Sequence, residues 1–224
     1  MLNLEDYKLD CLPDTCYYIP NFITEAEEKL LLHEIYKTPL CKWTQLSHRR
    51  LMNIGGVPTS KGMIAETIPN YLQNYVDRIN EINIFPPNCH ANHILLNEYK
   101  AGEGIMSHFD GPMFFPTIST LSIGSHCVLE FNKPPKEDEK YEIVKELKVL
   151  VEPRSLLILK DNMYTDYMHS ISEIKEDDLN DPLIKNLDKC DQLNEMKMLE
   201  RTTRISLTIR HVPKTSKMKL KFFK

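Results

Sequence analysis

The chain has 224 residues, of which 42% are hydrophobic and 27% are charged, as expected for a soluble globular protein with one full core. Its formal net charge of -4 excludes a protein that attracts polyanions through overall charge. No run approaches the roughly 18 apolar residues of a membrane helix, and the acidic start, Met-Leu-Asn-Leu-Glu-Asp, lacks a secretory signal pattern.

The six cysteines show no C-x-x-C spacing. We therefore expect reduced thiols, a cytoplasmic and nuclear location, no membrane partner and a monomer. The charges are unevenly spread. No Asp or Glu occurs from Ile35 to Ala65 or after Glu200, although both segments carry Lys and Arg. Such basic segments can contact phosphates, and the alternative is a solvated surface with a basic tail.

The first elements in chain order are helical. Residues 1–16 form a polar lead-in. Thr24 and Glu27 form a capping box, which predicts a helix that continues to about Lys37. A second amphipathic helix is predicted over 68–80, with a proline in its first turn.

Residues 42–62 contain a glycine pair and Pro58, which predicts a loop or a short irregular hairpin. Downstream, short apolar runs divided by turn residues predict strands over 91–99, 105–109, 117–124, 127–132, 145–151, 155–160, 167–172 and 203–211. Residues 133–141 read as a polar hairpin loop. The acidic segment 173–201 is predicted to be a flexible insertion with a helix near 182–189. We expect one domain over 17–213 with an all-β jelly-roll core and flanking helices, followed by a basic tail over 214–224.

His108 lies in the predicted strand 105–109, and Asp110 stands two positions after His108, at the end of that strand. Positions i and i+2 of a strand face the same side, so an imidazole nitrogen and a carboxylate oxygen there can bind one metal ion. Two histidines and one carboxylate form the facial triad of non-haem Fe(II) enzymes, which leaves positions open for a cosubstrate and oxygen. The pair alone also occurs by chance on solvated strands, so its meaning depends on the rest of the chain.

A third ligand has to come from one of three downstream histidines. His126 follows a turn and precedes an apolar strand, which favours a structural role. His211 directly follows Arg210 and so faces away from the arginines of the last strand. His169 is the best candidate by elimination, although a lone histidine in such a strand is more often a core residue.

The last predicted strand, 203–211, alternates polar and apolar residues. One face carries two guanidiniums and two hydroxyls, from Arg204, Ser206, Thr208 and Arg210. A buried charged face is costly unless it is paired, and an arginine fork suits a carboxylate. Asn97 and Tyr99 share a face of strand 91–99 and can hydrogen-bond the same carboxylate. The alternative is an edge strand with a solvated polar face.

These residues resemble the AlkB family of dioxygenases. The matching segments are Asn97-x-Tyr99, His108-x-Asp110, His169 and Arg204-x-Ser-x-Thr-x-Arg210, with Ser206 where the family usually has Asn. Longer stretches resemble one animal subfamily in particular, and they include Lys42-Trp-Thr-Gln-Leu-Ser47, Asn53-x-Gly55-Gly56 and His108-x-Asp-Gly-Pro112. The resemblance covers roughly residues 17–213.

The resemblance implies a double-stranded β-helix with iron at its mouth. Fe(II) would be bound by His108, Asp110 and His169. The cosubstrate 2-oxoglutarate would be held by Asn97, Tyr99, Arg204, Ser206, Thr208 and Arg210, with Arg204 facing its distal carboxylate. With O2, such an enzyme hydroxylates an N-alkyl group and releases succinate and CO2, and an N-methyl group is then lost as formaldehyde.

In this family the segment before the barrel often forms a lid over the nucleotide. Here that lid would be 42–62, with Trp43, His48, Arg49 and Arg50 as candidate substrate contacts through stacking and phosphate binding. Core packing is an equal alternative for Trp43. Several repair members carry an acidic residue two positions after the metal-binding Asp, and this chain has Pro112 there, which speaks against repair of alkylated bases.

The leading hypothesis is therefore an Fe(II)- and 2-oxoglutarate-dependent dioxygenase that dealkylates a nucleic acid, single-stranded or with a flipped base. A second hypothesis keeps the chemistry but makes the substrate a protein side chain, so that the enzyme is a protein hydroxylase or demethylase. A third is a non-catalytic binding module for a modified residue, which the intact ligand and arginine positions disfavour.

Overall fold

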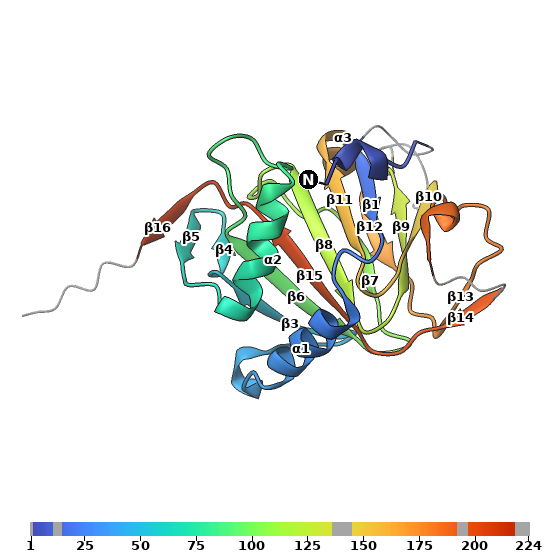
Figure 1. Ribbon diagram of the computed structural model, residues 1–224, viewed down its shortest axis with the longest axis horizontal. Coiled ribbons are helices and arrows are strands. Elements are labelled where there is room, and N and C mark those ends of the chain that lie inside the picture. Colours follow the sequence, from blue (N-terminus) through green and yellow to red (C-terminus); the bar gives the residue numbers. More distant parts are fainter. Residues whose placement is uncertain (1, 11–14, 136–144, 192–196, 218–224) are drawn as a thin grey trace, which may run out of the picture.

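The computed structural model describes residues 2–10, 15–135, 145–191 and 197–217. Two antiparallel sheets form the layers of a β sandwich, in the orders β1-β11-β8-β15-β6-β3-β2 and β10-β9-β12-β7 (Figure 1). The bounds in the larger sheet are β1 Cys16–Ile19, β11 Leu156–Lys160, β8 Thr117–Ile123, β15 Arg204–Arg210, β6 His93–Tyr99, β3 Arg49–Ile54 and β2 Thr44–Leu46. Those in the smaller sheet are β10 Leu147–Val151, β9 Cys127–Asn132, β12 Met168–Ile171 and β7 Ile105–His108. Each of the eight strands predicted after residue 90 is present, with ends shifted by at most two residues.

The alternation of residues along the central strands separates two environments. In β15, the apolar Ile205, Leu207 and Ile209 are fully buried in a core cluster on the outer face of the larger sheet. The polar residues between them face the smaller sheet and line a cavity. One strand therefore packs the core with one face and builds a site with the other, as its period of two requires.

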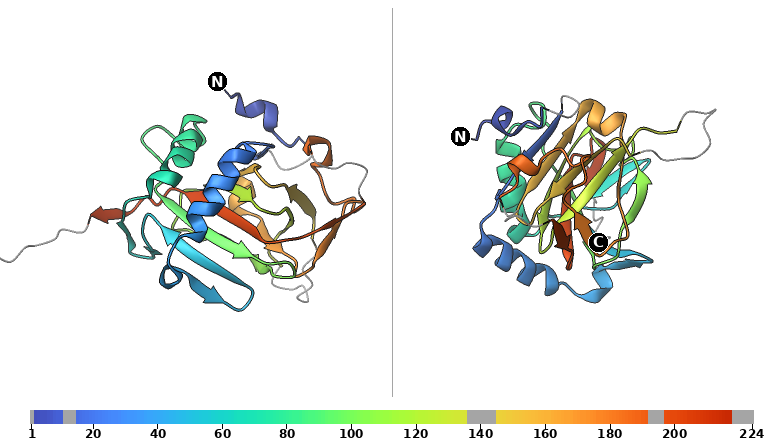
Figure 2. Two further views of the ribbon diagram at one scale, coloured as in Figure 1. Left: turned by 60° about the horizontal axis from the view of Figure 1, so that its bottom comes forward. Right: turned by 90° about the vertical axis from the view of Figure 1, so that its right-hand side faces the viewer.

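Helices α1 (Glu25–Tyr36) and α2 (Asn70–Glu81) cover the outer face of the larger sheet (Figures 1 and 2). The predicted capping box is present, since the Glu27 amide donates to Thr24 Oγ1 and the Thr24 amide donates to Glu27 Oε2. Pro69 is the residue that precedes α2 rather than part of its first turn. The remaining helical segments are α3 (Asp161–Thr165) and the 3-10 turns η1 (Leu4–Tyr7), η2 (Leu40–Lys42) and η3 (Leu187–Lys189).

The predicted lid, residues 42–62, is more regular than a loop. It contains β2 and β3, which extend the larger sheet through pairing of β3 with β6. It then enters a second hairpin made of β4 (Pro58–Thr59) and β5 (Gly62–Ala65). The lid is therefore built onto the edge of the barrel by backbone hydrogen bonds, which fix where its side chains point.

The acidic insertion 173–201 also differs from the prediction. Its described residues form a short antiparallel pair, β13 (Glu176–Asp178) with β14 (Met198–Glu200), and the helix predicted near 182–189 is limited to the turn η3. Asp177 is 2% exposed and accepts two hydrogen bonds from Arg201, at 2.7 and 2.6 Å. This buried ion pair joins the two ends of the insertion, and Asp177 also lies 3.2 Å from Nε2 of His126, outside the insertion. The acidic composition alone does not reveal these contacts.

Both ends of the described chain join the fold. Leu9, within the predicted polar lead-in, is 1% exposed and belongs to the core between the sheets. In the predicted basic tail, β16 (Thr215–Lys217) pairs in parallel with β5 and completes a small sheet of order β16-β5-β4. Residues 218–224 of the tail and most of the predicted loop 133–141 lie outside the described residues. Among the described helices, none is long and apolar enough to cross a membrane.

Candidate functional site

One end of the cavity between the two sheets gathers the residues of the predicted metal site. Strands β7 and β12 are neighbours, and their register places His169 opposite His108, with ring centroids 4.4 Å apart. Asp110 follows β7 by two residues, and its Oδ2 lies 3.8 Å from Nε2 of His169. The fold thus brings together the pair predicted from spacing and the histidine predicted by elimination.

Both imidazoles present a nitrogen suited to a metal. Nδ1 of His108 lies 2.8 Å from the carbonyl oxygen of Met106, which can only accept, so Nδ1 donates and Nε2 keeps its lone pair. Burial, reinforced by His108 and Arg210, lowers the pKa of His169 to about 4, against the opposing effect of Asp110. His169 is therefore neutral at pH 7, the form that binds metals.

The carboxylate of Asp110 is held by an arginine. Arg210 Nη1 donates to Asp110 Oδ1 at 2.6 Å, and both side chains are buried. In the described residues, no group of three ligating side chains is already arranged to hold a metal ion. Nε2 of His169 and Oδ2 of Asp110 are 3.8 Å apart beside His108. Two imidazoles and one carboxylate are the ligands of a facial triad, so this donor set fits Fe(II).

The cavity has a volume of about 220 Å³ and runs from the metal-site residues to Arg204. It is lined by all six residues predicted to hold the cosubstrate, Asn97, Tyr99, Arg204, Ser206, Thr208 and Arg210. Arg204 donates from Nη2 to Ser122 Oγ at 2.8 Å, and its Cζ lies 6.0 Å from the centre of the Tyr99 ring. Burial raises the pKa of Tyr99 to about 12, so its hydroxyl stays protonated and can donate.

Several buried polar atoms in this cavity have no partner. Three are N–H donors, Arg204 Nε, Arg210 Nε and Arg49 Nε, and one is an acceptor, Asn97 Oδ1. A buried N–H without an acceptor is costly, so the three guanidinium donors indicate a ligand rather than packing. Guanidinium donors require an acceptor with lone pairs, and a carboxylate matches their fork. The residues present therefore fit a small dicarboxylate such as 2-oxoglutarate.

The two alternative histidines lie elsewhere. His126 Nε2 is 3.2 Å from Asp177 Oδ2, under the insertion. His211 is bonded through Nδ1 to the carbonyl oxygen of His90, 2.6 Å away, and contacts the rings of Phe85 and Phe115. Neither lines the cavity, in agreement with the structural role predicted for His126 and with the strand face predicted for His211.

The four predicted substrate contacts of the lid are split between different environments. Arg50 donates two hydrogen bonds to Glu98, at 2.8 and 2.7 Å, and its Cζ lies 4.1 Å from the centre of the Trp43 ring. Trp43 is partly buried against the core, as the packing alternative predicts. His48 is exposed, with Nδ1 3.4 Å from Glu173 Oε1. Only Arg49 points into the cavity.

Sequence reasoning missed several residues around the site. Ser122 and Thr120 come from the second half of β8, where polar and apolar residues alternate as they do in β15, its neighbour in the sheet. That alternation is a signal that could have identified them. Phe114 lies under the Arg210 guanidinium, with Cζ 3.9 Å from the ring centre, and Tyr164 donates to the carbonyl oxygen of Gly111 at 2.6 Å. These contacts depend on loop conformation, which carries no periodic signal.

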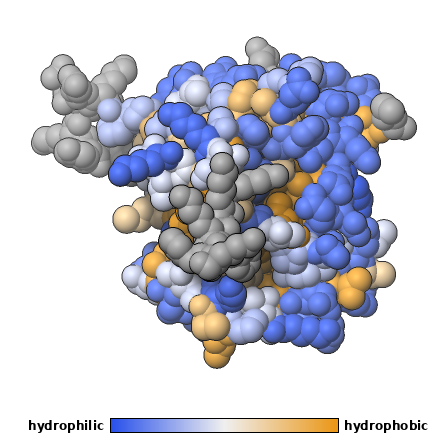
Figure 3. Space-filling model, turned by 90° about the vertical axis from the view of Figure 1, so that its left-hand side faces the viewer, coloured by the Kyte–Doolittle hydropathy of each residue, from blue (hydrophilic) through white to orange (hydrophobic). Residues whose placement is uncertain are grey.

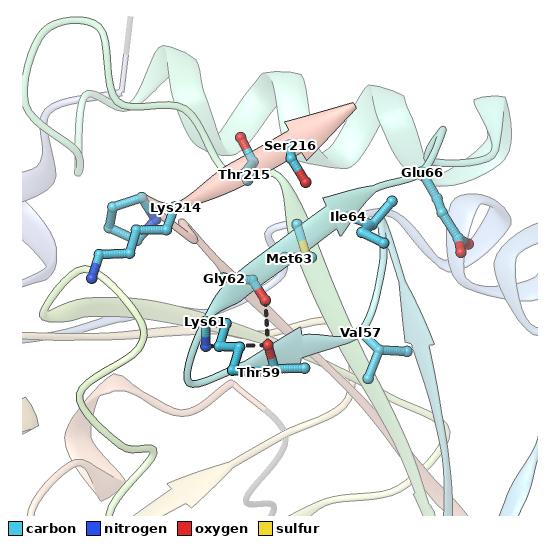
Figure 4. A pocket seen from close by; sticks show the side chains of 11 residues that line it. Val57, Thr59, Lys61, Gly62, Met63, Ile64, Glu66, Lys214, Thr215 and Ser216 are labelled. Atoms are coloured by element: carbon cyan, nitrogen blue, oxygen red, sulfur yellow. Dashed lines mark hydrogen bonds between the residues drawn. The ribbon is translucent and has the colours of Figure 1, made fainter. Parts of the chain in front are cut away.

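A larger and more open hollow of about 760 Å³ lies on the small sheet β16-β5-β4 (Figure 4). It is lined by lysines, hydroxyl residues, exposed apolar side chains and one carboxylate, that of Glu66, and contains no histidine, cysteine or aspartate. Size alone would favour this hollow as the active site. The grouping of metal-binding side chains and partnerless buried donors places the chemistry in the smaller cavity instead.

Comparison with known proteins identifies the family of the chain. Residues 53–210 match the model of the 2OG-Fe(II) oxygenase superfamily. A Danio rerio protein described as "Probable RNA/DNA demethylase ALKBH6" is 46% identical over 219 residues, or 96% of this chain and 92% of that protein. The uncharacterized protein L905 of Acanthamoeba polyphaga mimivirus is 31% identical over 204 residues, with 88% of this chain and 84% of that protein covered.

Solved structures share the fold at low sequence identity. OsALKBH1 has a TM-score of 0.54 at 15% identity and covers 89% of this chain and 99% of its own. A 2OG-Fe(II) oxygenase family oxidoreductase from Burkholderia pseudomallei has a TM-score of 0.58 at 9% identity and covers 94% and 90%. A prolyl-4-hydroxylase from Pseudomonas putida has a TM-score of 0.52 at 9% identity and covers 89% and 93%.

The chain belongs to the 2OG-Fe(II) oxygenase superfamily and, within it, to the AlkB family. It is accordingly an oxidoreductase, a dioxygenase that uses Fe(II), 2-oxoglutarate and O2. The Danio rerio relative is the sixth animal AlkB homologue, which is the subfamily that the longer sequence stretches resemble.

Proposed function

We propose that this dioxygenase oxidatively demethylates an N-alkyl group of a nucleic acid and releases succinate and CO2. One observation carries the proposal: two histidines and a carboxylate meet in the same cavity as buried guanidinium donors that lack partners. A metal site and a carboxylate site in one cavity are the requirements of this chemistry.

In the proposed mechanism, His108, Asp110 and His169 hold Fe(II). Asn97, Tyr99 and Arg204 bind the distal carboxylate of 2-oxoglutarate, with Ser206 and Thr208 beside them. Arg210 orients Asp110 through the hydrogen bond from Nη1 and so fixes which carboxylate oxygen faces His169. The apolar side chains of Leu95, Ile118, Leu129, Leu157 and Leu159 line the same cavity and exclude water.

When bound, Fe(II) and 2-oxoglutarate would supply oxidative hydroxylation: 2-oxoglutarate, O2 and the substrate C–H group would give succinate, CO2 and a hydroxylated carbon, and an N-hydroxymethyl product would release formaldehyde. The chain's own residues supply position and a low-dielectric surrounding. The buried Arg204 and Tyr99 keep the distal carboxylate in place. A cosubstrate held in this way has a fixed orientation toward the metal site, which favours reaction because the reacting groups do not have to meet by diffusion.

The pairing of two basic segments supports a nucleic acid as substrate. The acid-free stretches 35–65 and 201–224 are far apart in the sequence, and the parallel pairing of β16 with β5 joins them. Exposed Lys61 and Lys214 lie on the same side of the hollow on this sheet, which Thr59, Thr215 and Ser216 also line (Figure 4). Figure 3 shows that end of the molecule as a largely hydrophilic surface. Lysines and hydroxyls are the usual contacts to phosphates.

This sheet borders the metal end of the cavity. Met63 of β5 is 1% exposed and packs in a cluster with Phe114 and Val212. Phe114 in turn lies against Arg210, which is bonded to Asp110. A strand of nucleic acid on the sheet would therefore run beside the cavity, where a flipped base could enter. The name of the Danio rerio relative, "Probable RNA/DNA demethylase ALKBH6", supports the same substrate class.

The cofactor site is tested by anaerobic titration of apo-protein with Fe(II) and then 2-oxoglutarate, while the visible metal-to-ligand charge-transfer band is recorded. We expect a band in the wild type and none in His108→Ala or Arg204→Ala. Lys42→Gln, which removes an exposed lysine of the lid, is the control. A folded wild-type protein without a band would overturn the oxygenase mechanism at this site.

The substrate is tested by fluorescence anisotropy with a labelled single-stranded oligonucleotide at several salt concentrations. The logarithm of the binding constant should fall linearly with the logarithm of the salt concentration. The double variant Lys61→Glu/Lys214→Glu should bind more weakly and show a smaller slope of that line. Succinate release that is stimulated by an N-methylated oligonucleotide would complete the case. Succinate release that responds only to a methylated peptide would instead support the protein-directed alternative.

A further inference from the structure

Arg49 has an unusual position for a lid residue. Its guanidinium lines the cavity, and its buried Nε has no hydrogen-bond partner. The next residue, Arg50, points to the opposite side of β3, where Glu98 and Trp43 engage it. The alternation of the strand thus assigns the two neighbouring arginines different tasks.

The register of three adjacent strands places Arg49 next to the cosubstrate residues. In the pairing of β3 with β6, Arg50 lies opposite Glu98, so Arg49 falls beside Tyr99. In the pairing of β15 with β6, Tyr99 lies opposite Arg204. Neighbouring strands are about 4.8 Å apart, so the backbones of Arg49 and Arg204 are about 10 Å apart with Tyr99 between them.

The electrostatics agree with the order Arg49, Tyr99, Arg204 across the three strands. Burial raises the pKa of Tyr99 to about 12, and the charges of Arg204 and Arg49 act in the opposite direction by favouring its ionised form. Two guanidiniums therefore act on one buried phenol. Two positive charges at the same buried end of a cavity favour an anion between them. A carboxylate has enough lone pairs to accept hydrogen bonds from both guanidiniums.

We propose that Arg49 and Arg204 together hold the distal carboxylate of 2-oxoglutarate, one from each side of Tyr99. This inference rests on the proposed function, since it assumes that the cosubstrate occupies this cavity. It gives the lid hairpin β2–β3 a second role. Because Arg49 belongs to that hairpin, bound cosubstrate would add a side-chain contact between the lid hairpin and the larger sheet to the backbone pairing of β3 with β6.

The test compares two keto acids. Isothermal titration of Mn(II)-loaded protein measures the dissociation constants of 2-oxoglutarate and of 2-oxobutyrate, which lacks the distal carboxylate. The variants are Arg49→Gln, Arg49→Lys, Arg204→Gln and the lid control Lys42→Gln. Thermal unfolding of each variant verifies that it is folded.

We expect Arg49→Gln to weaken 2-oxoglutarate binding by about 10- to 100-fold, the usual effect of losing a charge-assisted hydrogen bond. Its binding of 2-oxobutyrate should stay unchanged. Arg49→Lys should lose less affinity for 2-oxoglutarate, because lysine keeps the positive charge and lacks only the two-pronged hydrogen bonding of a guanidinium. If Arg49→Gln destabilises the fold, Arg49→Lys alone carries the comparison between the two keto acids.

Two results would overturn the inference while leaving the proposed function intact. One is wild-type affinity of Arg49→Gln for 2-oxoglutarate, with affinity lost in Arg204→Gln. The other is weaker binding of a single-stranded oligonucleotide by Arg49→Gln with unchanged 2-oxoglutarate binding, which would make Arg49 a phosphate contact. Absence of 2-oxoglutarate binding by the wild type would refute the proposed function itself.

Discussion

Arg210 Nη1 donates a hydrogen bond of 2.6 Å to Oδ1 of Asp110, and the two side chains are 5% and 8% exposed. The ion pair connects the end of β15 to the residue that follows β7 in the opposite sheet. It neutralises the carboxylate in a buried setting and leaves Oδ2 turned toward His169. Arg210, which its motif predicts to contact the cosubstrate, thus positions Asp110, a candidate metal ligand.

Replacement of Arg210 should therefore weaken metal binding. In Arg210→Gln, we expect the dissociation constant for Fe(II) to rise by about 10- to 100-fold, because partners that orient a ligand have effects of this size. Metal-dependent quenching of Trp43 fluorescence or metal content after dialysis provides the measurement. Thr208→Ala, two positions earlier on the same face, is the control for the loss of a polar cavity residue. Wild-type metal affinity in Arg210→Gln would show that the ion pair has no positioning role.

The Arg50–Glu98 pair should stabilise the lid hairpin. Arg50 bonds both carboxylate oxygens of Glu98, whose side chain is 5% exposed. We expect Arg50→Gln to lower the free energy of unfolding by about 2 kcal/mol, the cost of losing charge-assisted hydrogen bonds at a partly buried site. Urea titration followed by Trp43 fluorescence measures it, because Arg50 lies over that ring. The double variant Arg50→Gln/Glu98→Gln should lose less stability than the two single variants lose together. A loss equal to the sum of the two single losses would show that the two side chains do not interact.

The strand pattern made much of this fold predictable. Ile205, Leu207 and Ile209 alternate with polar residues, and that period alone identifies both the buried face and the cavity face of β15. The capping box at Thr24 likewise marked the first residue of α1 because the signal is local. His108 and His169 could be selected because each lies in a short strand with a definite facing direction, whereas Asp110, two residues beyond the end of β7, could be selected only from its spacing to His108.

Contacts between distant segments were beyond sequence reasoning. Arg201 and Asp177 form the buried pair that fixes the insertion, and neither residue stands out in a run of charges. Arg49 and Arg50 are adjacent in the sequence, and only the pairing of β3 with β6 determines which one enters the cavity. Sequence patterns report the period of an element, whereas these contacts depend on register and tertiary packing.

Stability should fall in mild acid through His93. This side chain is 0% exposed, and burial, reinforced by Arg210, lowers its pKa to about 3. The unfolded chain takes up the proton near pH 6.5 while the folded protein does not, so stability decreases as pH drops from about 6.5 toward 3. The slope is up to about 1.4 kcal/mol per pH unit for one such group. His169, whose pKa is about 4, contributes in the same direction over a narrower range.

The measurement for His93 is urea unfolding at several pH values between 4 and 8. His93→Gln should have a shallower pH dependence than the wild type, because one group that titrates only on unfolding is gone. His33→Gln, which removes an exposed histidine of α1, is the matched control. Equal slopes for the wild type and His93→Gln would rule out His93 as a source of acid sensitivity.

The hydroxyl of Tyr164 should position the turn after Asp110. It donates to the carbonyl oxygen of Gly111 at 2.6 Å, while the ring packs against the cluster of Met63, Phe114 and Val212. Gly111 has φ +98°, a conformation that a side chain would strain, so the turn depends on outside support. Tyr164→Phe keeps the ring and should cost about 1 kcal/mol of stability.

Tyr164→Phe should also slow catalysis, because a small misplacement of a reacting group lowers the rate. We expect kcat to fall by up to about tenfold with the KM for 2-oxoglutarate unchanged. Tyr167→Phe, at a nearby tyrosine in the core between the sheets, is the control, and a Tyr164→Phe enzyme with full kcat would reduce the hydroxyl to a structural contact.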